Sequence, residues 1–311
     1  MKSNPKITII IPVYNAIKYL QACLDSILVQ NFTDWECVIV DDGSSDGSGS
    51  ICDIYSERDR RFTVFHQENC GVSCARNLGI INSNGKWITF VDADDYLLPQ
   101  SIESLYQAAI DNYSDFVYGN TIRRDGIKDN HVISNLKDQS WINDYGMLAH
   151  FGLWGCLFKS EIIKKGNNIF VEGLAYGEDM IFKLIYLKYV RKITTISAPV
   201  YIYRVNLESV TNSSNKVRSA HHQLVATKYL IDLAKLEKNN PCYKKTLLKT
   251  IFSSRRQIYC DVAYNPIRND RIEIIKDYYR ILGSSFFNIV QLYYNVWKLR
   301  LRRGIKSLLL K

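Results

Sequence analysis

The chain has 311 residues, of which 47% are hydrophobic and 12% aromatic. That composition excludes an intrinsically disordered protein and is typical of a globular fold with a large core. The net charge is +9, and residues 268–311 alone carry ten Lys and Arg against three acids. No nucleic-acid-binding motif accompanies this basic excess, which argues against DNA or RNA as a partner.

The eight cysteines are scattered and form no Cys-x-x-Cys pair, so we expect reduced thiols and neither a disulfide framework nor a zinc site. No run of eighteen apolar residues is present, and a membrane-spanning helix is not expected. The apolar segment near the start, Ile7–Val13, contains Thr8 and Pro12 and lacks a cleavage site, so we interpret it as a first core strand.

Strand-like and helix-like segments alternate through the first third of the chain. The predicted strands are Ile7–Val13, Trp35–Val40, Phe62–His66, Lys86–Val91 and Asp115–Tyr118. The predicted helices are Ala16–Leu28, a segment ending near Arg58, Gly71–Ile81 and Leu98–Asn112. This alternation predicts an α/β fold with a parallel sheet between helices, in which ligands bind at the carboxyl ends of the strands.

After Asn120 the alternation weakens. The expected elements are a loop over 121–140, a short helix at Trp141–Leu148, an apolar segment at 153–158, a helical turn at Ser160–Lys165, a helix from Gly177 to Val190, one more strand or extended pair at Arg191–Arg204, and helices over 216–311. Pro199 suggests that the strand at Arg191–Arg204 lies at an edge. A polar linker over 211–215 separates two expected domains. These are a catalytic domain at 1–208 and a helical C-terminal extension at 209–311.

The segment Asp92-Ala93-Asp94-Asp95 follows a buried strand directly. Three carboxylates this close repel one another unless a cation or several hydrogen-bond donors offset their charge, and hard oxygen ligands suit Mg²⁺ or Mn²⁺. The alternative is that these aspartates cap a following helix that starts near Leu98-Pro99.

Five motifs in the same order resemble the family-2 glycosyltransferases of the GT-A fold. They are Ile11-Pro12-Val13-Tyr14-Asn15, Val40 to Ser48 (VDDGSSDGS), Asn69 to Asn77, Asp92-Ala93-Asp94-Asp95 and Gly177-Glu178-Asp179. The resemblance covers roughly residues 5–205. It implies a Rossmann-like, mixed, mostly parallel sheet flanked by helices, and transfer of a sugar from a nucleotide-sugar, usually a UDP-sugar, with inversion at the anomeric carbon.

The resemblance assigns the donor-binding residues. Pro12, Tyr14, Asn15, Asp41, Asp42, Arg76, Asp92 and Ala93 are expected to bind the nucleotide-sugar, and Asp92 and Asp94 a Mg²⁺ or Mn²⁺ ion. Each has an ordinary structural alternative. Tyr14 could pack in the core, Asp41 and Asp42 could stabilise a turn, and Arg76 could be a surface cation or a partner of the acidic cluster.

The resemblance also gives Asp179 the role of catalytic base, with Glu178 beside it, while an acidic pair at a helix start is the alternative. Trp154 precedes this pair in an apolar segment, where the family places acceptor-side residues. A tryptophan there could form a platform for a sugar ring or be part of the core.

Residues 297–309 combine apolar side chains at helical spacing with Lys298, Arg302 and Lys306, a pattern typical of an interfacial helix. The alternative is a helix packed on the catalytic domain with a solvated basic face. The prediction is a metal-dependent inverting glycosyltransferase that acts on a glycan or lipid-linked acceptor in bacterial cell-surface polysaccharide synthesis. We expect it in the cytoplasm, peripheral to the inner face of the cytoplasmic membrane.

Two rival functions remain. One is a non-catalytic, membrane-associated subunit of glycan assembly. The other is a sugar nucleotidyltransferase, although Pro12-Val13-Tyr14-Asn15 is not the glycine- and lysine-rich phosphate loop that such enzymes usually need.

Overall fold

The structure is a computed structural model that describes residues 4–125, 128–132, 136–142, 152–166, 169–174, 176–205, 216–264, 275, 277–278 and 280–281. The chain divides into two compact units. Unit 1 is Met1–Gly173 with Glu178–Leu207, and unit 2 is Leu174–Gly177 with Glu208–Lys311. The catalytic role expected for residues 1–208 and the membrane role expected for residues 209–311 stay predictions.

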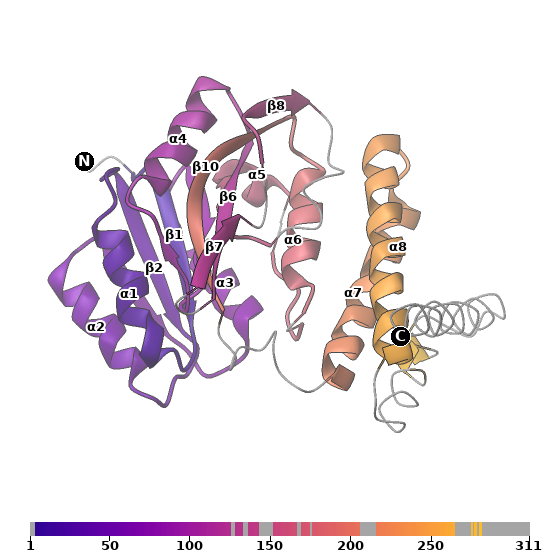
Figure 1. Ribbon diagram of the computed structural model, residues 1–311, viewed down its shortest axis with the longest axis horizontal. Helices are drawn as coiled ribbons and strands as arrows, with labels where there is room; N and C mark the ends of the chain where they lie inside the picture. Colours follow the sequence, from indigo (N-terminus) through magenta and orange to yellow (C-terminus); the bar gives the residue numbers. More distant parts are fainter. Residues whose placement is uncertain are drawn as a thin grey trace. The chain divides into compact units, whose positions relative to one another are not determined.

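Unit 1 is built on one ten-stranded sheet (Figure 1). Its strands are β1 (Ile7–Val13), β2 (Trp35–Asp41), β3 (Phe62–His66), β4 (Trp87–Phe90), β5 (Tyr96–Leu97), β6 (Phe116–Asp125), β7 (Lys128–Val132), β8 (Gln139–Ile142), β9 (Cys156–Lys159) and β10 (Lys192–Arg204). The main path runs β3-β2-β1-β4-β9-β6-β10-β5. Strands β3, β2, β1 and β4 are parallel, β9 is antiparallel to both neighbours, and β10 is parallel to β6.

Helices cover both faces of this sheet. They are α1 (Ile17–Leu28), α2 (Ser48–Arg58), α3 (Val72–Ile81), α4 (Ser101–Asp111), α5 (Ser160–Lys165) and α6 (Glu178–Leu187). Apolar side chains of α1, α2 and α4 share one core cluster with β1 and β2, whereas Ala75 of α3 packs with Val38 and Val40 in a second cluster. Figure 1 shows α1 and α2 on one side of the strands and α6 on the other. The predicted fold class, a mixed and mostly parallel sheet between helices, is confirmed.

The parallel register places the motif-bearing strand ends together. Val13 lies opposite Asp41, and Ile10 lies opposite Phe90. Because β2, β1 and β4 are adjacent and point the same way, the segments that follow Val13, Asp41 and Phe90 leave the sheet at the same edge.

The middle of the chain departs from the sequence-based prediction. The expected loop over 121–140 is largely strand, since β6 continues to Asp125 and is followed by β7 and β8. Part of the helix expected at Trp141–Leu148 is β8, and residues 143–148 lie outside the described part. Helix α4 starts at Ser101, not near Leu98-Pro99, and the two-residue strand β5 precedes it.

Strand β10 is not the edge strand that Pro199 suggested. It lies between β6 and β5 and also pairs with β8. Pro199 sits where the β10–β6 register shifts on both sides of it, between Ile196 and Tyr201. A bulge tolerates a residue without an N–H donor, which explains a proline inside a sheet.

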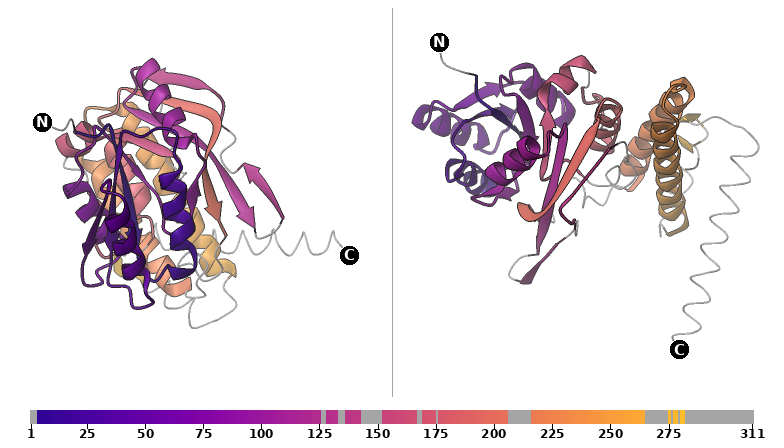
Figure 2. Two further views of the ribbon diagram at one scale, coloured as in Figure 1. Left: turned by 90° about the vertical axis from the view of Figure 1, so that its left-hand side faces the viewer. Right: turned by 90° about the horizontal axis from the view of Figure 1, so that it is seen from above.

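The described part of unit 2 consists mainly of two helices, α7 (Lys216–Leu236) and α8 (Pro241–Tyr264). They lie side by side (Figure 2) and bury side chains such as Leu224, Leu230 and Leu247. Among the described residues, no helix combines the length and the apolar character needed to cross a bilayer. The predicted linker at 211–215 and the amphipathic segment at 297–309 lie outside the described residues.

Candidate functional site

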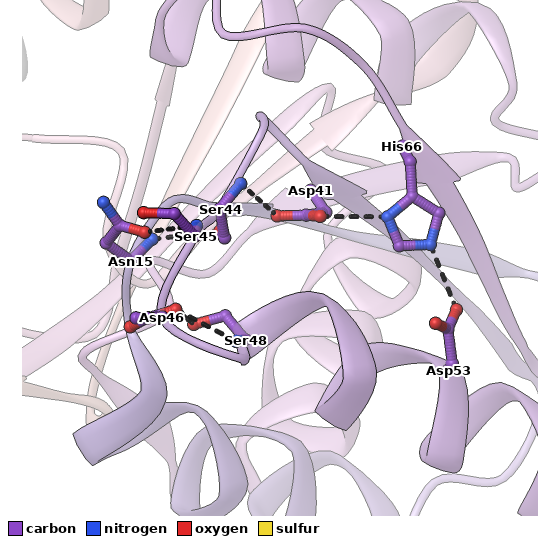
Figure 3. A network of polar contacts seen from close by, with 8 residues as sticks. All are labelled: Asn15, Asp41, Ser44, Ser45, Asp46, Ser48, Asp53 and His66. Carbon is purple, nitrogen blue, oxygen red and sulfur yellow. Dashed lines mark hydrogen bonds and ion pairs between the residues drawn. The ribbon is translucent and has the colours of Figure 1, made fainter.

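The loop after β2 is fastened to the loop after β1 by four hydrogen bonds. Asn15 N–H donates to Ser44 Oγ (3.0 Å), and Ser45 N–H donates to Asn15 Oδ1 (2.8 Å), as Figure 3 shows. Ala16 N–H donates to Ser48 Oγ (2.9 Å) and Ile17 N–H to Asp46 Oδ2 (3.0 Å). These bonds join the VDDGSSDGS motif (residues 40–48) to residues 13–17 at the end of β1, and we call the two joined segments the rim.

Three residues of this rim, Asn15, Gly43 and Gly47 (φ +96°), adopt left-handed backbone conformations. Asn15 has φ +48°, which asparagine tolerates better than most residues. Gly43 has φ +73°, and a Cβ there would lie 2.9 Å from Asn69 N. The glycine is therefore required both by its conformation and by the close backbone.

Asp41 and Asp42 are buried and already hold several donors. Asp41 Oδ1 accepts Ser44 N–H (3.1 Å), and its Oδ2 faces His66 Nδ1 (2.9 Å). Asp42 accepts the N–H groups of Cys70 (2.9 Å) and Gly71 (2.8 Å), which fixes the segment that leads into α3. The turn-stabilising alternative thus describes an observed role of Asp41, whereas Asp42 holds the segment before α3, and contact of either with a nucleotide stays a prediction.

The predicted aromatic residue at the end of β1 is accessible. Tyr14 is 54% exposed and so does not pack in the core. Pro12 is half-buried within β1 and Asn15 is exposed beside Tyr14. An exposed ring at the carboxyl edge of the sheet can stack against a planar base.

The three aspartates of the acidic turn have different environments. Asp95 is buried, accepts a hydrogen bond from Tyr201 Oη (2.8 Å) and another from Arg204 N–H (2.8 Å). Burial, together with the charges of Asp92 and Asp94, raises the pKa of Asp95 well above its usual range. Helix α4 starts only at Ser101, so Asp95 fastens the turn to β10 and does not cap that helix.

Asp92 and Asp94 are half-buried, and two side chains donate hydrogen bonds to the carboxylate of Asp92. Asp92 Oδ1 accepts a bond from Arg76 Nη2 (2.9 Å), and Oδ2 accepts a longer one from Trp154 Nε1 (3.3 Å). The Asp92 N–H donates to Tyr201 Oη (3.1 Å). Ala93 points into the core, which leaves only its backbone for ligand contact.

Arg76 joins the acidic turn to the predicted catalytic pair. Arg76 is 6% exposed, and its guanidinium donates through Nη2 to Asp92 and through Nη1 to Glu178 Oε1 (2.9 Å). It also lies 5.2 Å from the centre of the Phe170 ring. Arg76 is therefore the partner of the acidic cluster, and its direct contact with a diphosphate stays a prediction.

Glu178 and Asp179 are the first two residues of α6, and their environments differ. Glu178 is buried, and burial and the neighbouring charge of Asp179 raise the pKa of its carboxyl to about 7, against the opposing effect of Arg76. Asp179 is half-buried and accepts the N–H of Met180 through Oδ1 (2.7 Å). Glu178 is thus paired with Arg76, and the role of catalytic base stays a prediction for Asp179.

The environment of Trp154 combines features of the two predicted ones, the core and the site. It is half-buried, its ring packs against Tyr203 with centroids 4.7 Å apart, and its indole N–H reaches Asp92. Trp154 thus helps to orient Asp92.

A divalent cation fits the residues present at the acidic turn. No group of three or more His, Cys, Asp or Glu side chains suited to a metal ion exists among the described residues. Asp92 and Asp94 supply hard oxygen ligands, and Asp92 keeps lone pairs beyond the two bonds it accepts. A Mg²⁺ ion commonly takes one or two carboxylates and completes its shell with phosphate oxygens and water. The pair fits a cation that arrives with a diphosphate.

Several residues of this network carry no local sequence signal. Tyr201 and Arg204 lie more than a hundred positions from Asp95 in the chain, and each reaches it through β10. Phe170 is held by a reciprocal pair of hydrogen bonds with Asn77, one residue after Arg76. The pairing of β10 with β5 brings Tyr201 and Arg204 to the acidic turn.

Comparison with known proteins identifies relatives of this chain. Residues 8–160 match the family model described as "Glycosyl transferase family 2". A protein named "Uncharacterized glycosyltransferase EpsJ" from Bacillus subtilis is 32% identical over 228 residues. That alignment covers 70% of this chain and 66% of the relative, so the chain spans just under two thirds of the relative's length.

Solved structures share the fold at low sequence identity. TarS of S. aureus, solved in complex with UDP-GlcNAc, superposes with a TM-score of 0.74 at 18% identity, covering 88% of this chain and 79% of that one. The mannosyltransferase PcManGT of Pyrobaculum calidifontis, in complex with GDP-Man and Mn²⁺, gives a TM-score of 0.55 at 18% identity and covers 94% and 85% of the two chains.

Proposed function

Because this chain belongs to glycosyl transferase family 2 over residues 8–160, we propose that it transfers a sugar from a nucleotide-sugar to a hydroxyl group with inversion at the anomeric carbon. The observation that carries this proposal is the buried Arg76, which bonds Asp92 on one side and Glu178 on the other. It holds a candidate diphosphate-binding turn beside a candidate base.

The donor side is formed by the rim and the acidic turn. Tyr14 stacks near the base. The nucleotide rests on the loop after β2, which Asp41 holds through Ser44, and on the segment before α3, which Asp42 holds through Cys70. Both carboxylates keep lone pairs for polar groups of the nucleotide. UDP-GlcNAc and GDP-Man in structures of the same fold support a nucleotide diphosphate sugar as donor. We favour a UDP-sugar.

Asp92 and Asp94 would hold Mg²⁺ or Mn²⁺ with the diphosphate of the donor. The bound cation would supply charge neutralisation for the departing nucleotide diphosphate. Arg76 and Trp154 fix the carboxylate of Asp92, so this ligand is oriented before substrate arrives.

Asp179 acts as the general base. An acceptor hydroxyl loses its proton to this carboxylate while its oxygen forms a bond to the anomeric carbon and the bond to the nucleotide diphosphate breaks. Asp179 lies in the first turn of α6, where the amino end of a helix favours negative charge. Glu178 positions the base by anchoring the helix start to Arg76.

We further propose that the acceptor is a glycan or a lipid-linked glycan of bacterial cell-surface polysaccharide synthesis, used at the inner face of the cytoplasmic membrane. The support is the basic, amphipathic sequence of residues 297–309. A hexosyl or N-acetylhexosaminyl group is the expected cargo.

Calorimetric titration with UDP tests the donor site. UDP should bind in the presence of Mn²⁺ or Mg²⁺, and Asp94→Asn should remove the cation-dependent part of the affinity. Asp34→Asn is the matched control, because Asp34 pairs with Lys6 at the opposite ends of the strands. Equal cation dependence in wild type and Asp94→Asn would contradict the assignment of Asp94. Release of UDP or GDP from a panel of nucleotide-sugars then identifies the donor.

A further inference from the structure

His66, the last residue of β3, lies between two carboxylates that come from different elements. Its Nδ1 is 2.9 Å from Asp41 Oδ2 at the end of β2, and its Nε2 is 3.0 Å from Asp53 Oδ1 on α2 (Figure 3). We name Asp41, His66 and Asp53 the His66 clamp. None of the roles proposed above for substrate contact uses His66 or Asp53.

The geometry of the clamp requires a charged imidazole. Ionised carboxylates only accept hydrogen bonds, so both ring nitrogens must donate, and only the imidazolium carries two N–H groups. The same two carboxylates raise the pKa of His66 above its ordinary value, against a smaller opposing effect of burial. Cys52 also lies beside both carboxylates, but burial raises the pKa of its thiol to about 12, so it stays neutral.

The His66 clamp joins the two ends of the loop that follows β2. The chain leaves β2 at Asp41, runs through the loop 43–47 and enters α2 at Ser48, so His66 ties the residue before the loop to the helix after it. Asp41 Oδ1 meanwhile holds Ser44 N–H inside the loop. A Cβ at Gly49 would lie 2.8 Å from Asp41 Oδ2, so only glycine leaves room for this arrangement.

We propose that the His66 clamp positions the rim for the donor nucleotide and that loss of the His66 proton opens it, so that nucleotide affinity falls as pH rises. The proposal rests on the donor site proposed above. His66 is a positioning residue, since it acts through Asp41 and α2 on the loop that carries the contacts to Asn15 and Ile17.

The direction of the effect follows from the number of N–H groups. A neutral ring has one N–H, so one nitrogen turns a lone pair toward a carboxylate and that contact is lost. Asp41 is buried whereas the Asp53 side chain is 53% exposed and can be hydrated, so the contact with Asp53 opens. The clamp is intact below the pKa of the folded protein and open above it.

The test is the affinity for UDP, at fixed Mg²⁺, from about pH 6 to about pH 9. Wild-type affinity should fall about two- to fivefold, the effect expected for one half-exposed ion pair. Asp53→Asn should abolish this step and keep the tighter affinity, because the amide can donate to the unprotonated Nε2 as well as accept from it. His66→Phe should bind weakly throughout the range. Asp59→Asn, at the far end of α2 and paired with Arg61, is the control and should keep the step.

An identical step in wild type and Asp53→Asn, or no step in wild type, would overturn the proposal. A second readout does not depend on the ligand. In NMR titrations of the free protein, the amide of Ser44 should shift with the ring of His66 in wild type and lose that transition in Asp53→Asn, and a Ser44 amide that ignores the ring would overturn the clamp. If neither UDP nor GDP binds at any pH while the Ser44 amide follows His66, the donor-site proposal has failed and the clamp has not.

Discussion

Three aspartates within four residues of the acidic turn occupy three different environments. Asp95 is buried against Tyr201 and Arg204, Asp92 is held by Arg76 and Trp154, and Asp94 is half-buried. Their side chains are chemically equal in the sequence, and burial and hydrogen bonding separate them. The negative charge they concentrate is offset in part by Arg76, and the proposed cation would offset the rest.

At the residue scale, Asp179→Asn separates binding from chemistry. The change removes the proton acceptor, so turnover measured as nucleotide release should fall about 10²- to 10⁴-fold, while affinity for UDP stays within about twofold. Glu161→Gln is the control, because Glu161 is an exposed acid in the first turn of α5. Unchanged turnover in Asp179→Asn would place the base elsewhere.

Glu178→Gln gives a second prediction, on stability. The pKa of Glu178 is about 7 in the folded protein, against an ordinary value of 4.5. Between these two pH values the folded state holds a proton on Glu178 that the unfolded state has lost. Stability therefore decreases as pH rises through this range. Gln keeps an acceptor for Arg76 and does not titrate. The loss of unfolding free energy caused by the substitution, measured by urea unfolding, should therefore be largest near pH 4.5 and shrink toward pH 8. A cost that grows with pH would mean that ionised Glu178 stabilises the fold through Arg76.

At the element scale, the position of α3 depends on a close approach to β1. A Cβ at Gly79 would clash with Ile10 Cγ2, and the same helix carries Arg76 and Asn77. A glycine inside a helix is otherwise unfavourable by roughly 1 kcal/mol relative to alanine. The close packing of the helix on the strand explains why it is present.

Gly79→Ala should therefore destabilise the protein although it improves helix propensity. We expect a net loss of about 1–3 kcal/mol in the free energy of unfolding from denaturant titration, because a strand residue must move. Ser50→Ala, at an exposed position of α2, tests propensity alone and should be neutral or slightly stabilising. A stabilised Gly79→Ala variant would contradict the contact.

The first half of the sheet was predictable from the sequence because its strands are buried, apolar and separated by amphipathic helices. Strands β1 and β3 have the predicted bounds, and β2 differs by one residue. The region after Asn120 was not predictable in this way. Strands β6, β7 and β8 contain polar residues, and their conformation depends on distant partners, as for Thr195 of β10 opposite Gln139 of β8.

The candidate site, like the sheet, was predictable from the sequence only in part. The motifs locate the strand ends that carry Tyr14 and Asp92, because the carboxyl edge of a parallel sheet follows from the alternation. They do not show that Arg76 points to Glu178, 102 positions along the chain, because that contact depends on how α3 and α6 pack on the sheet. Side-chain direction is fixed by tertiary packing, and no local pattern records it.

At the scale of the whole molecule, positive charge is placed unevenly. Most of the net charge of +9 comes from residues 268–311, outside the part of the chain that carries the motifs. A basic segment near one end of an enzyme can bring it to an anionic surface without altering its active site.

The membrane proposal predicts a specific loss on charge reversal. The triple variant Lys298→Glu, Arg302→Glu and Lys306→Glu should reduce co-sedimentation with phosphatidylglycerol vesicles about a hundredfold, since each basic residue near such a surface contributes about 1 kcal/mol. Hydrolysis of the nucleotide-sugar in solution should not change. The control reverses three exposed lysines of unit 2, Lys238, Lys245 and Lys249. Equal losses in both variants would indicate that only total charge matters.

The position of β10 has a consequence for how the protein is made. Strands β1 to β4 need only residues that precede the acidic turn, so they can pair while the rest of the chain is still being synthesised. Asp95 receives its two donors, Tyr201 and Arg204, only after more than a hundred further residues have been added. A nascent chain that stops before β10 therefore lacks the two donors that hold Asp95 in the acidic turn. The proposed donor-binding edge is therefore complete only once β10 has been made, and a shorter chain lacks part of the site proposed for a nucleotide-sugar.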